Sequence, residues 1–490
     1  MKHRGVLLAA LAAAFLLLPA LRLPSAAQPA PGRLIFAPIG AMVGVAVTAR
    51  GTNLAPATRF ALVWHSARAH WNVGDGKFNG ILGPDATRTL ASGTSDAQGT
   101  LSLHFSVPED FGYIHDVELQ PDGGTVAAHQ GFTIIPHLTV APASGPLGTP
   151  ITITMTGDGY RFYQLNWHLM YDGAQTGWLS AITTHGTARV TIPATGAIGM
   201  HTLQALEGPT APYLNEQQSP NYQPLIPTVI AGSFKIVPGT PHLPGSVKLQ
   251  TLPRVHSPGA ATANTAMPSF GADFRSGVVG STIALSGHGF TPHTAIAIAW
   301  ETVVGDDISG NGFALQQRPL TSATSDGAGA FSVRVRTPDD LGGDHRIIAQ
   351  ERGQPATTTA AITYTITPSV GAIAPAGVLR PGEEITIHVK GASWTETGNI
   401  YTVDVDDAYF GYACGFFSQG DVTMRIRAPG GSGWHFIDLY PAIYNGKILG
   451  PGLPPQGSDV NGSYFLLPML NVIDHPAERM PAFHFAIRVR

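Results

Sequence analysis

The sequence predicts an all-β fold of four tandem two-layer β-sandwich domains, which follow an N-terminal signal peptide. Three observations lead to this prediction. One order of strand-like segments recurs four times along the 490 residues, and such a repeat defines the architecture. Apolar residues alternate at period two in those segments, and 58 glycines and 40 prolines supply turns between them. No amphipathic helical stretch of useful length follows the signal peptide.

Each copy opens with an alternating apolar run that ends in glycine. In the first copy, Val45, Val47 and Ala49 precede Gly51 at steps of two. A period of two places one side-chain face in the core and the other in water. The four runs end at Gly51, Gly157, Gly287 and Gly391.

The next strand carries a large core anchor. It is Trp64, Trp167 and Trp300 in the first three copies, whereas the fourth has Tyr401 and Val403 and no tryptophan. A tryptophan at this place fills the space between the sheets of immunoglobulin-like sandwiches. Because these residues alternate with other core positions, we expect burial rather than sugar stacking.

A third run closes with proline in every copy, and a histidine follows six to eight residues later. These histidines are His115, His201, His345 and His435. A metal needs three or four ligands that converge on one point, and here each domain has one such histidine. We therefore expect a structural corner residue that bonds to nearby backbone.

An aromatic-x-x-x-Pro strand closes each copy, at residues 132–136, 234–238, 364–368 and 464–468. The expected organisation is a signal peptide at 1–27, immunoglobulin-like domains at 33–137, 138–238, 270–368 and 369–468, a linker at 239–269 and a C-terminal strand or tail at 469–490. Copies two and four carry insertions at 208–232 and 440–462, which copies one and three lack. A duplicated two-domain unit explains this pattern better than four independent copies with chance insertions.

Two strings resemble a known family. Residues 143–149 (ASGPLGT) with 157–160 (GDGY), and residues 286–292 (SGHGFTP), resemble bacterial immunoglobulin-like repeats of the IPT/TIG type. Copy four departs from this corner, with GASW at 391–394. The resemblance implies the fold of nearly the whole mature chain. It leaves function open, because such domains serve as spacers, adhesins and appendages of enzymes.

Composition and the N-terminus indicate an exported protein. Lys2, His3 and Arg4 precede an apolar stretch and the small residues 25–27, as in a cleaved signal peptide. Net charge is −4 with 12% charged residues, so nothing favours nucleic acid or an anionic membrane as partner. We expect the single cysteine, Cys414, to be a small buried hydrophobe, with intermolecular pairing as the alternative.

Candidate ligand-binding residues lie in the two insertions, where tyrosines stand among amides. They are Tyr213, Asn215, Glu216, Asn221, Tyr222, Tyr444 and Asn445. The alternative is that both insertions cover a neighbouring domain. A weak calcium-like string comprises Asp306, Asp307, Ser309 and Asn311, but its twelfth position is Arg318 rather than glutamate. Neither a cofactor nor another metal site is predicted.

No enzyme signature appears in the sequence. The leading hypothesis is a secreted or cell-surface, non-enzymatic, rod-like protein that acts as an adhesin or structural spacer. The first alternative is a module that binds an extracellular glycan or protein through the loops of domains 2 and 4. The second is a secreted hydrolase whose site lies between domains, because catalytic triads are recognised by geometry and not by sequence position.

Overall fold

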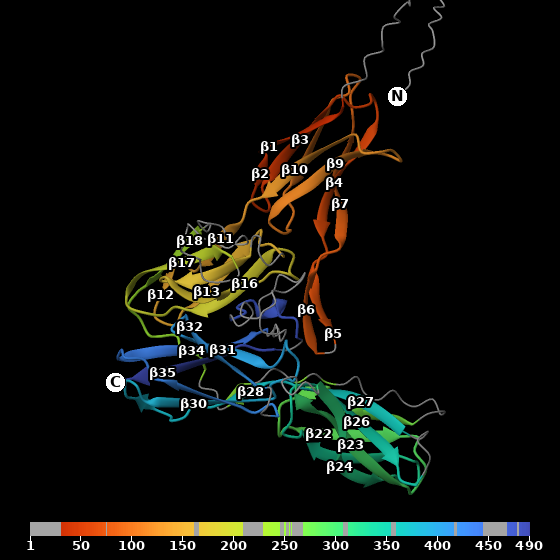
Figure 1. Ribbon diagram of the computed structural model, residues 1–490, viewed down its shortest axis with the longest axis vertical. Helices are drawn as coiled ribbons and strands as arrows, with labels where there is room; N and C mark the ends of the chain where they lie inside the picture. Colours follow the sequence, from red (N-terminus) through yellow and green to blue (C-terminus); the bar gives the residue numbers. More distant parts are fainter. Residues whose placement is uncertain are drawn as a thin grey trace, which may run out of the picture.

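A computed structural model shows an all-β protein (Figure 1). It describes residues 31–490 except 75, 161–165, 209–228, 246–248, 251–253, 255, 257–267, 307–311, 354–358, 416–418, 444–467 and 478–479. The described chain forms tandem immunoglobulin-like sandwiches, each with a small sheet and a five-stranded sheet. A short 3-10 turn, η2 (Val472–Asp474), interrupts the strands. None of the described segments forms a helix long and apolar enough to span a bilayer.

Domain 1 pairs a three-stranded sheet with a five-stranded one. The strand orders are β1 (Arg33–Ala37), β3 (Ala46–Thr52), β8 (Leu101–Ser106), and β2 (Gly40–Ala41), β10 (Ala128–Ile134), β9 (Tyr113–Pro121), β4 (Arg59–Ala67), β7 (Asp85–Thr94). All pairs are antiparallel except β2 with β10. The alternation around Gly51 is seen directly, since Val47 and Ala49 are buried.

Domain 2 repeats this plan. Its sheets are β11 (His137–Ala141), β13 (Pro150–Thr156), β16 (Thr187–Pro193), and β12 (Ser144–Gly145), β18 (Val229–Ile236), β17 (Gly199–Glu207), β14 (Trp167–Tyr171), β15 (Ala174–Trp178). Domain 3 has β20 (Ser269–Ala272), β22 (Thr282–His288), β25 (Phe331–Arg336), and β21 (Ser276–Gly277), β27 (Thr359–Ile366), β26 (Gly343–Glu351), β23 (Ala295–Asp306), β24 (Gly312–Thr324).

Domain 4 closes differently from the sequence prediction. Its sheets are β19 (Leu249–Gln250), β28 (Ser369–Gly371), β30 (Glu384–Lys390), β33 (Val422–Arg427), and β29 (Val378–Leu379), β35 (Phe483–Val489), β34 (Gly433–Ala442), β31 (Ile400–Val405), β32 (Ala408–Cys414). The expected closing strand at 464–468 falls almost wholly outside the described residues, and β35 holds the place beside β34. Phe483, Phe485 and Ile487 alternate into the core, so the segment expected as a C-terminal strand or tail forms a strand of this sheet.

The expected linker is tied to three domains at its described residues. His242 donates its backbone N–H to Leu147 of domain 2 at 2.8 Å. The short strand β19 joins the small sheet of domain 4 by pairing with β28. Arg254 lies over the Phe274 ring of domain 3 and donates to the Thr282 carbonyl at 2.8 Å. The segment therefore fastens the two halves together.

Each sandwich has its own core, and a further apolar cluster joins the halves. Domain 1 sends out a hairpin of β5 (His70–Gly74) and β6 (Lys77–Leu82), which runs down past domain 2 in Figure 1. We call the cluster at its end the hub: Trp71, Phe78 and Ile81 of the hairpin, Trp178 of domain 2, and Tyr409, Ile443 and Met469 of domain 4. The hub joins domains 1, 2 and 4 at one place, whereas the sequence predicts a rod-like protein.

Polar contacts reinforce the hub. Trp71 Nε1 donates to the Asp474 carbonyl at 2.5 Å, and Phe78 N donates to Glu396 Oε2 at 2.7 Å. The Asp474 carboxylate accepts N–H bonds from Ile182 at 2.9 Å and Thr183 at 2.6 Å. Residues more than 290 positions apart in the sequence are thus hydrogen-bonded, and domains 1 and 3 extend from the paired domains 2 and 4 (Figure 1).

Candidate functional site

A buried Trp–Asp–His arrangement organises the end of domain 1 that faces domain 2. Trp64 is fully buried, and its Nε1 donates to Asp110 Oδ2 at 2.9 Å. Asp110 Oδ1 also accepts the Ser66 hydroxyl at 2.6 Å and the Phe111 N–H at 2.9 Å. The Trp64 and His115 rings stack with centroids 4.3 Å apart. The tryptophan therefore serves packing and also anchors the loop before β9.

Domain 3 contains the same arrangement. Trp300 Nε1 donates to Asp340 Oδ2 at 2.8 Å, and Thr302 donates to Oδ1 at 2.9 Å. His345 stacks on Trp300 at 4.5 Å. Gln419 of domain 4 also donates to Asp340. Burial acts to raise the pKa of Asp340, but these hydrogen bonds outweigh it and hold the pKa below its ordinary value.

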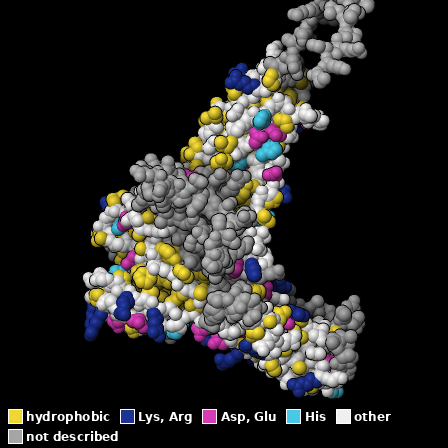
Figure 2. Space-filling view, in the orientation of Figure 1, with side chains coloured by type: hydrophobic (Ala, Val, Ile, Leu, Met, Phe, Trp, Pro, Cys, Tyr) yellow, Lys and Arg dark blue, Asp and Glu magenta, His cyan; other side chains and the backbone are white. Residues whose placement is uncertain are grey.

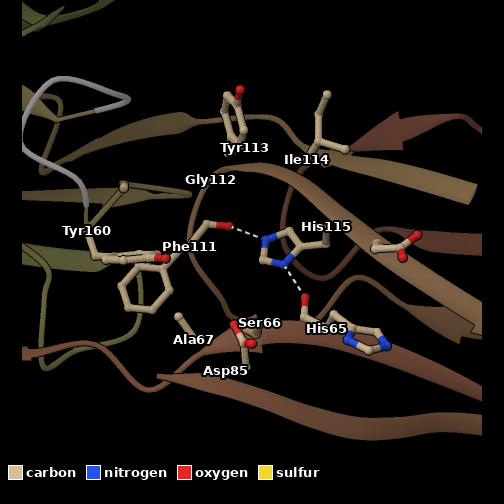
Figure 3. Close-up of a pocket in the computed structure, with 12 residues that line it drawn as sticks. His65, Ser66, Ala67, Asp85, Phe111, Gly112, Tyr113, Ile114, His115 and Tyr160 are labelled. Carbon is tan, nitrogen blue, oxygen red and sulfur yellow. Dashed lines mark hydrogen bonds between the residues drawn. The ribbon is translucent and has the colours of Figure 1, made fainter. Parts of the chain in front are cut away.

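The corner histidines each contact two hydrogen-bond acceptors. His115 lies 2.8 Å from the His65 carbonyl and 2.7 Å from the Phe111 carbonyl (Figure 3). His345 makes the same two backbone contacts, whereas His201 and His435 each contact one carbonyl and one aspartate. In the part of the chain that the structure describes, no three His, Cys, Asp or Glu side chains could hold a metal ion.

The loop before each odd-domain histidine also forms the junction with the next domain. Gly112 N donates to the Asp158 carbonyl of domain 2 at 3.0 Å. In the second half, Gly342 N donates to the Ala392 carbonyl of domain 4 at 2.9 Å. The two junctions are therefore built alike, which supports the duplicated two-domain unit.

A cavity of about 190 Å³, which we call the junction cleft, opens where domain 1 meets domain 2 (Figure 3). It is lined by His65, Ser66, Ala67, Asp85, Phe111, Gly112, Tyr113, Ile114, His115, Asp116, Gly159 and Tyr160. The Tyr160 ring packs on Phe111 with centroids 4.9 Å apart, which closes one side of the cleft. In Figure 3, Tyr113 and Ile114 lie above His115, and Asp85 lies near Ser66.

Tyr113 has an unusual backbone conformation for a tyrosine. Its φ is +95°, and its side chain is 49% exposed. The residue two positions before the corner histidine has positive φ in every copy, and it is glycine in the other three, Gly199, Gly343 and Gly433. A side chain in this region is disfavoured because Cβ clashes with the backbone. The pattern within one copy does not reveal this position, whereas an alignment of the four copies on their corner histidines does.

Charged side chains line the exposed sheet of domain 1 next to the cleft. Figure 2 shows histidine and acidic side chains side by side on the visible face of this domain. His65 Nε2 lies 3.2 Å from the Glu118 carboxylate, and His129 Nδ1 lies 3.2 Å from the Asp116 carboxylate. Partial burial acts to raise the pKa of Glu118, but hydrogen bonds from Gln120 and His65 hold it below its ordinary value.

A second cavity of about 350 Å³ lies between domain 2, the linker and domain 4. Leu243 and Phe436 give it apolar walls, and Asp438 accepts a 2.7 Å bond from His484 at its base. Asp404 pairs with Asp438 across the sheet, is 1% exposed, and has no hydrogen-bond partner among the described residues for either carboxylate oxygen. Burial and the nearby Asp438 and Asp407 raise the pKa of Asp404 well above its ordinary value.

The structure places few of the predicted ligand residues. The loop candidates Tyr213, Asn215, Glu216, Asn221, Tyr222, Tyr444 and Asn445 lie outside the described residues, as do Asp307, Ser309 and Asn311 of the calcium-like string. Asp306 is the last residue of β23, opposite Gly312. The described start of the second insertion is buried, and Tyr440 packs into the core of domain 2.

One prediction about the cysteine is wrong. Cys414 is exposed at the end of the edge strand β32, where Phe410 and Tyr412 are exposed at the two preceding alternate positions. The alternation in this strand directs Cys414 to the solvent side, so its small apolar character does not determine its burial.

Comparisons with known proteins identify no family for this chain. No family model and no curated protein matches it. Salmonella alpha-2-macroglobulin aligns at 11% identity and TM-score 0.19, over 92% of this chain and 30% of that one. The tetra-tandem repeat of a large adhesion protein aligns at 10% identity and TM-score 0.17, over 84% of this chain and 95% of that one. The ICAM-5 D1–D4 fragment aligns at 12% identity and TM-score 0.20, over 94% of this chain and 100% of that one. The chain thus spans under a third of the macroglobulin.

Proposed function

We propose that this chain is an exported, non-enzymatic adhesin-type protein, in which four sandwiches form one frame that presents domains 1 and 3. Its partner would be an extracellular protein or glycan. The Gly-x-Gly-aromatic corners of copies two and three support a kinship with IPT/TIG-type repeats as part of this proposal. The observation that carries it is the hub, which fixes domain 1 to domain 4 as well as to domain 2.

The frame favours adhesion over a spacer role. A spacer gains length when domains join end to end, whereas here the edge strands β15 and β32 of domains 2 and 4 lie together. Thr176 donates to the Asp407 carbonyl at 2.7 Å, and Thr195 donates to the Asp407 carboxylate at 2.6 Å. Such contacts hold domain 2 on domain 4, and the hub holds the domain 1 hairpin against both. The direction in which domain 1 projects is thereby fixed, and a fixed direction lowers the entropy that binding costs.

A flow assay tests this function. Beads that carry the full chain pass over surfaces coated with mixed polysaccharides or with mixed extracellular-matrix proteins, and albumin-coated beads serve as the control. We expect retention of the chain-coated beads on at least one coating, with no sugar or peptide released from it. Retention equal to that of albumin on every coating would contradict an adhesin, and release of product would indicate a hydrolase.

A further inference from the structure

We propose that the junction cleft is a glycan-binding site in which the Tyr113 ring stacks on the apolar face of one pyranose ring. This inference rests on the proposed adhesin function and gives it a site and a ligand class. It uses residues other than the loop candidates of domains 2 and 4. Three properties of the cleft support it: a strained aromatic residue, a lining that is both apolar and polar, and a small volume.

The fold does not need the Tyr113 side chain. Domain 3 builds the same turn, with the same stacked histidine, around Gly343 at φ +97°. Glycine adopts this conformation without the steric penalty that a tyrosine incurs. Tyr113 is 49% exposed and the adjacent Ile114 is 59% exposed, so burial does not account for either residue. Strain of this kind is characteristic of functional positions.

The side chains around the Tyr113 ring match the chemistry of a sugar. A pyranose has an apolar C–H face and a rim of hydroxyl groups. Tyr113 and Ile114 offer apolar surface, and the exposed Asp85 and Asp116 beside them offer carboxylate oxygens that accept hydroxyl hydrogen bonds. A site with a few polar groups placed around an apolar surface is typical of small-ligand recognition.

The cleft is also small. The volume of about 190 Å³ is below the roughly 300–1,000 Å³ of sites that enclose a drug-sized ligand. One sugar ring would fill the cleft while the rest of the glycan remains outside.

The experiment compares three forms of the full chain on an array of neutral hexose and N-acetylhexosamine oligosaccharides that also carries proline-rich peptides. The forms are the wild type, Tyr113→Gly and Tyr412→Ala. Tyr113→Gly copies the residue of the other domains and so preserves the turn. Tyr412 is 54% exposed on β32 of domain 4 and supplies a matched tyrosine outside the cleft.

We expect the wild type and Tyr412→Ala to bind the same glycans. Tyr113→Gly should bind them roughly tenfold more weakly, as expected for the loss of an aromatic contact, while its melting temperature stays equal or rises. Absence of glycan binding by the wild type, equal binding by Tyr113→Gly, or binding of only the peptides would each overturn the inference. Bead retention without glycan binding would refute the glycan site and leave the adhesin function standing.

Discussion

The first half of the molecule, domains 1 and 2, and the second half, domains 3 and 4, share their internal architecture. Trp64, Asp110 and His115 have counterparts in Trp300, Asp340 and His345. The even domains share another corner, in which Asp172 and Asp406 at positive φ contact His201 and His435 at 2.6 Å. Features present in both halves are those that the sandwich and its junction require.

The halves differ at several places. Among the described residues, domain 1 sends out the separate β5–β6 hairpin, whereas β23 and β24 of domain 3 continue as one long pair. Domain 1 also replaces the turn glycine with a tyrosine, Tyr113. In domain 4, Asp404 stands two residues before the corner Asp406, where domain 2 has Met170 before Asp172. Each of these features is absent from the corresponding domain of the other half, which still forms its sandwich. We therefore expect the features to serve the assembly of the domains or the binding of a partner.

The largest expected effect comes from breaking the hub. Phe78 is 1% exposed within it, so Phe78→Ala should destabilise the protein by about 3–5 kcal/mol. Phe313 of domain 3 packs on Trp394 but remains partly exposed, and Phe313→Ala should cost much less. Calorimetry of both variants makes the comparison. Equal losses would contradict a hub built from the first half's hairpin.

The next largest effect is expected from breaking the Trp–Asp–His arrangement that both halves share. Asp110→Asn and Asp340→Asn each remove a buried charged acceptor and should each cost about 1.5–3 kcal/mol. Because the pKa of Asp340 is lowered in the fold, its stabilisation is present above about pH 4 and is lost as the pH falls through the folded pKa. Urea unfolding from pH 3 to pH 7 measures this. If Asp340→Asn loses stability on acidification as much as the wild type does, the stabilising role given to the Asp340 carboxylate is contradicted.

A smaller effect concerns the buried Asp404. Its raised pKa means that the folded chain keeps a proton that the unfolded chain releases above about pH 4, so stability falls as the pH rises towards neutrality. Asp404→Asn should therefore gain about 1–3 kcal/mol at pH 7 relative to pH 4. The same unfolding series detects it, with Met170→Leu as the first-half control without a pH trend. A loss of stability at pH 7 would show that the carboxylate is needed.

The smallest expected effect comes from exchanging the turn residues of domains 1 and 3. Tyr113→Gly should stabilise by about 1 kcal/mol and Gly343→Tyr should destabilise by about 1–2 kcal/mol, because only glycine adopts this φ without strain. Ser393 lies 3.3 Å from the Cβ position of Gly343 and would have to shift as well. Melting temperatures of the two variants provide the test. Destabilisation by Tyr113→Gly would show that the ring supports the fold.

The local pattern of the sequence predicted the sandwiches but not how they assemble. Trp64, Trp167 and Trp300 occur in alternating runs, and all three are buried. The aromatic-x-x-x-Pro string at 464–468 lies almost wholly outside the described residues. The strand that pairs with β34 is Phe483–Val489, within the segment expected as a C-terminal strand or tail. The hairpin's partners Glu396 and Asp474 are too distant in sequence for any periodicity to reveal.

The single cysteine allows the most direct test of the locked frame. One spin label on the exposed Cys414 of domain 4 and a second on Asp122→Cys, in an exposed loop of domain 1, report the distance between these domains by pulsed electron resonance. The account predicts one narrow distance distribution, which broadens when Phe78→Ala is added. A broad distribution with the hub intact would mean that domain 1 moves freely, and would contradict the frame.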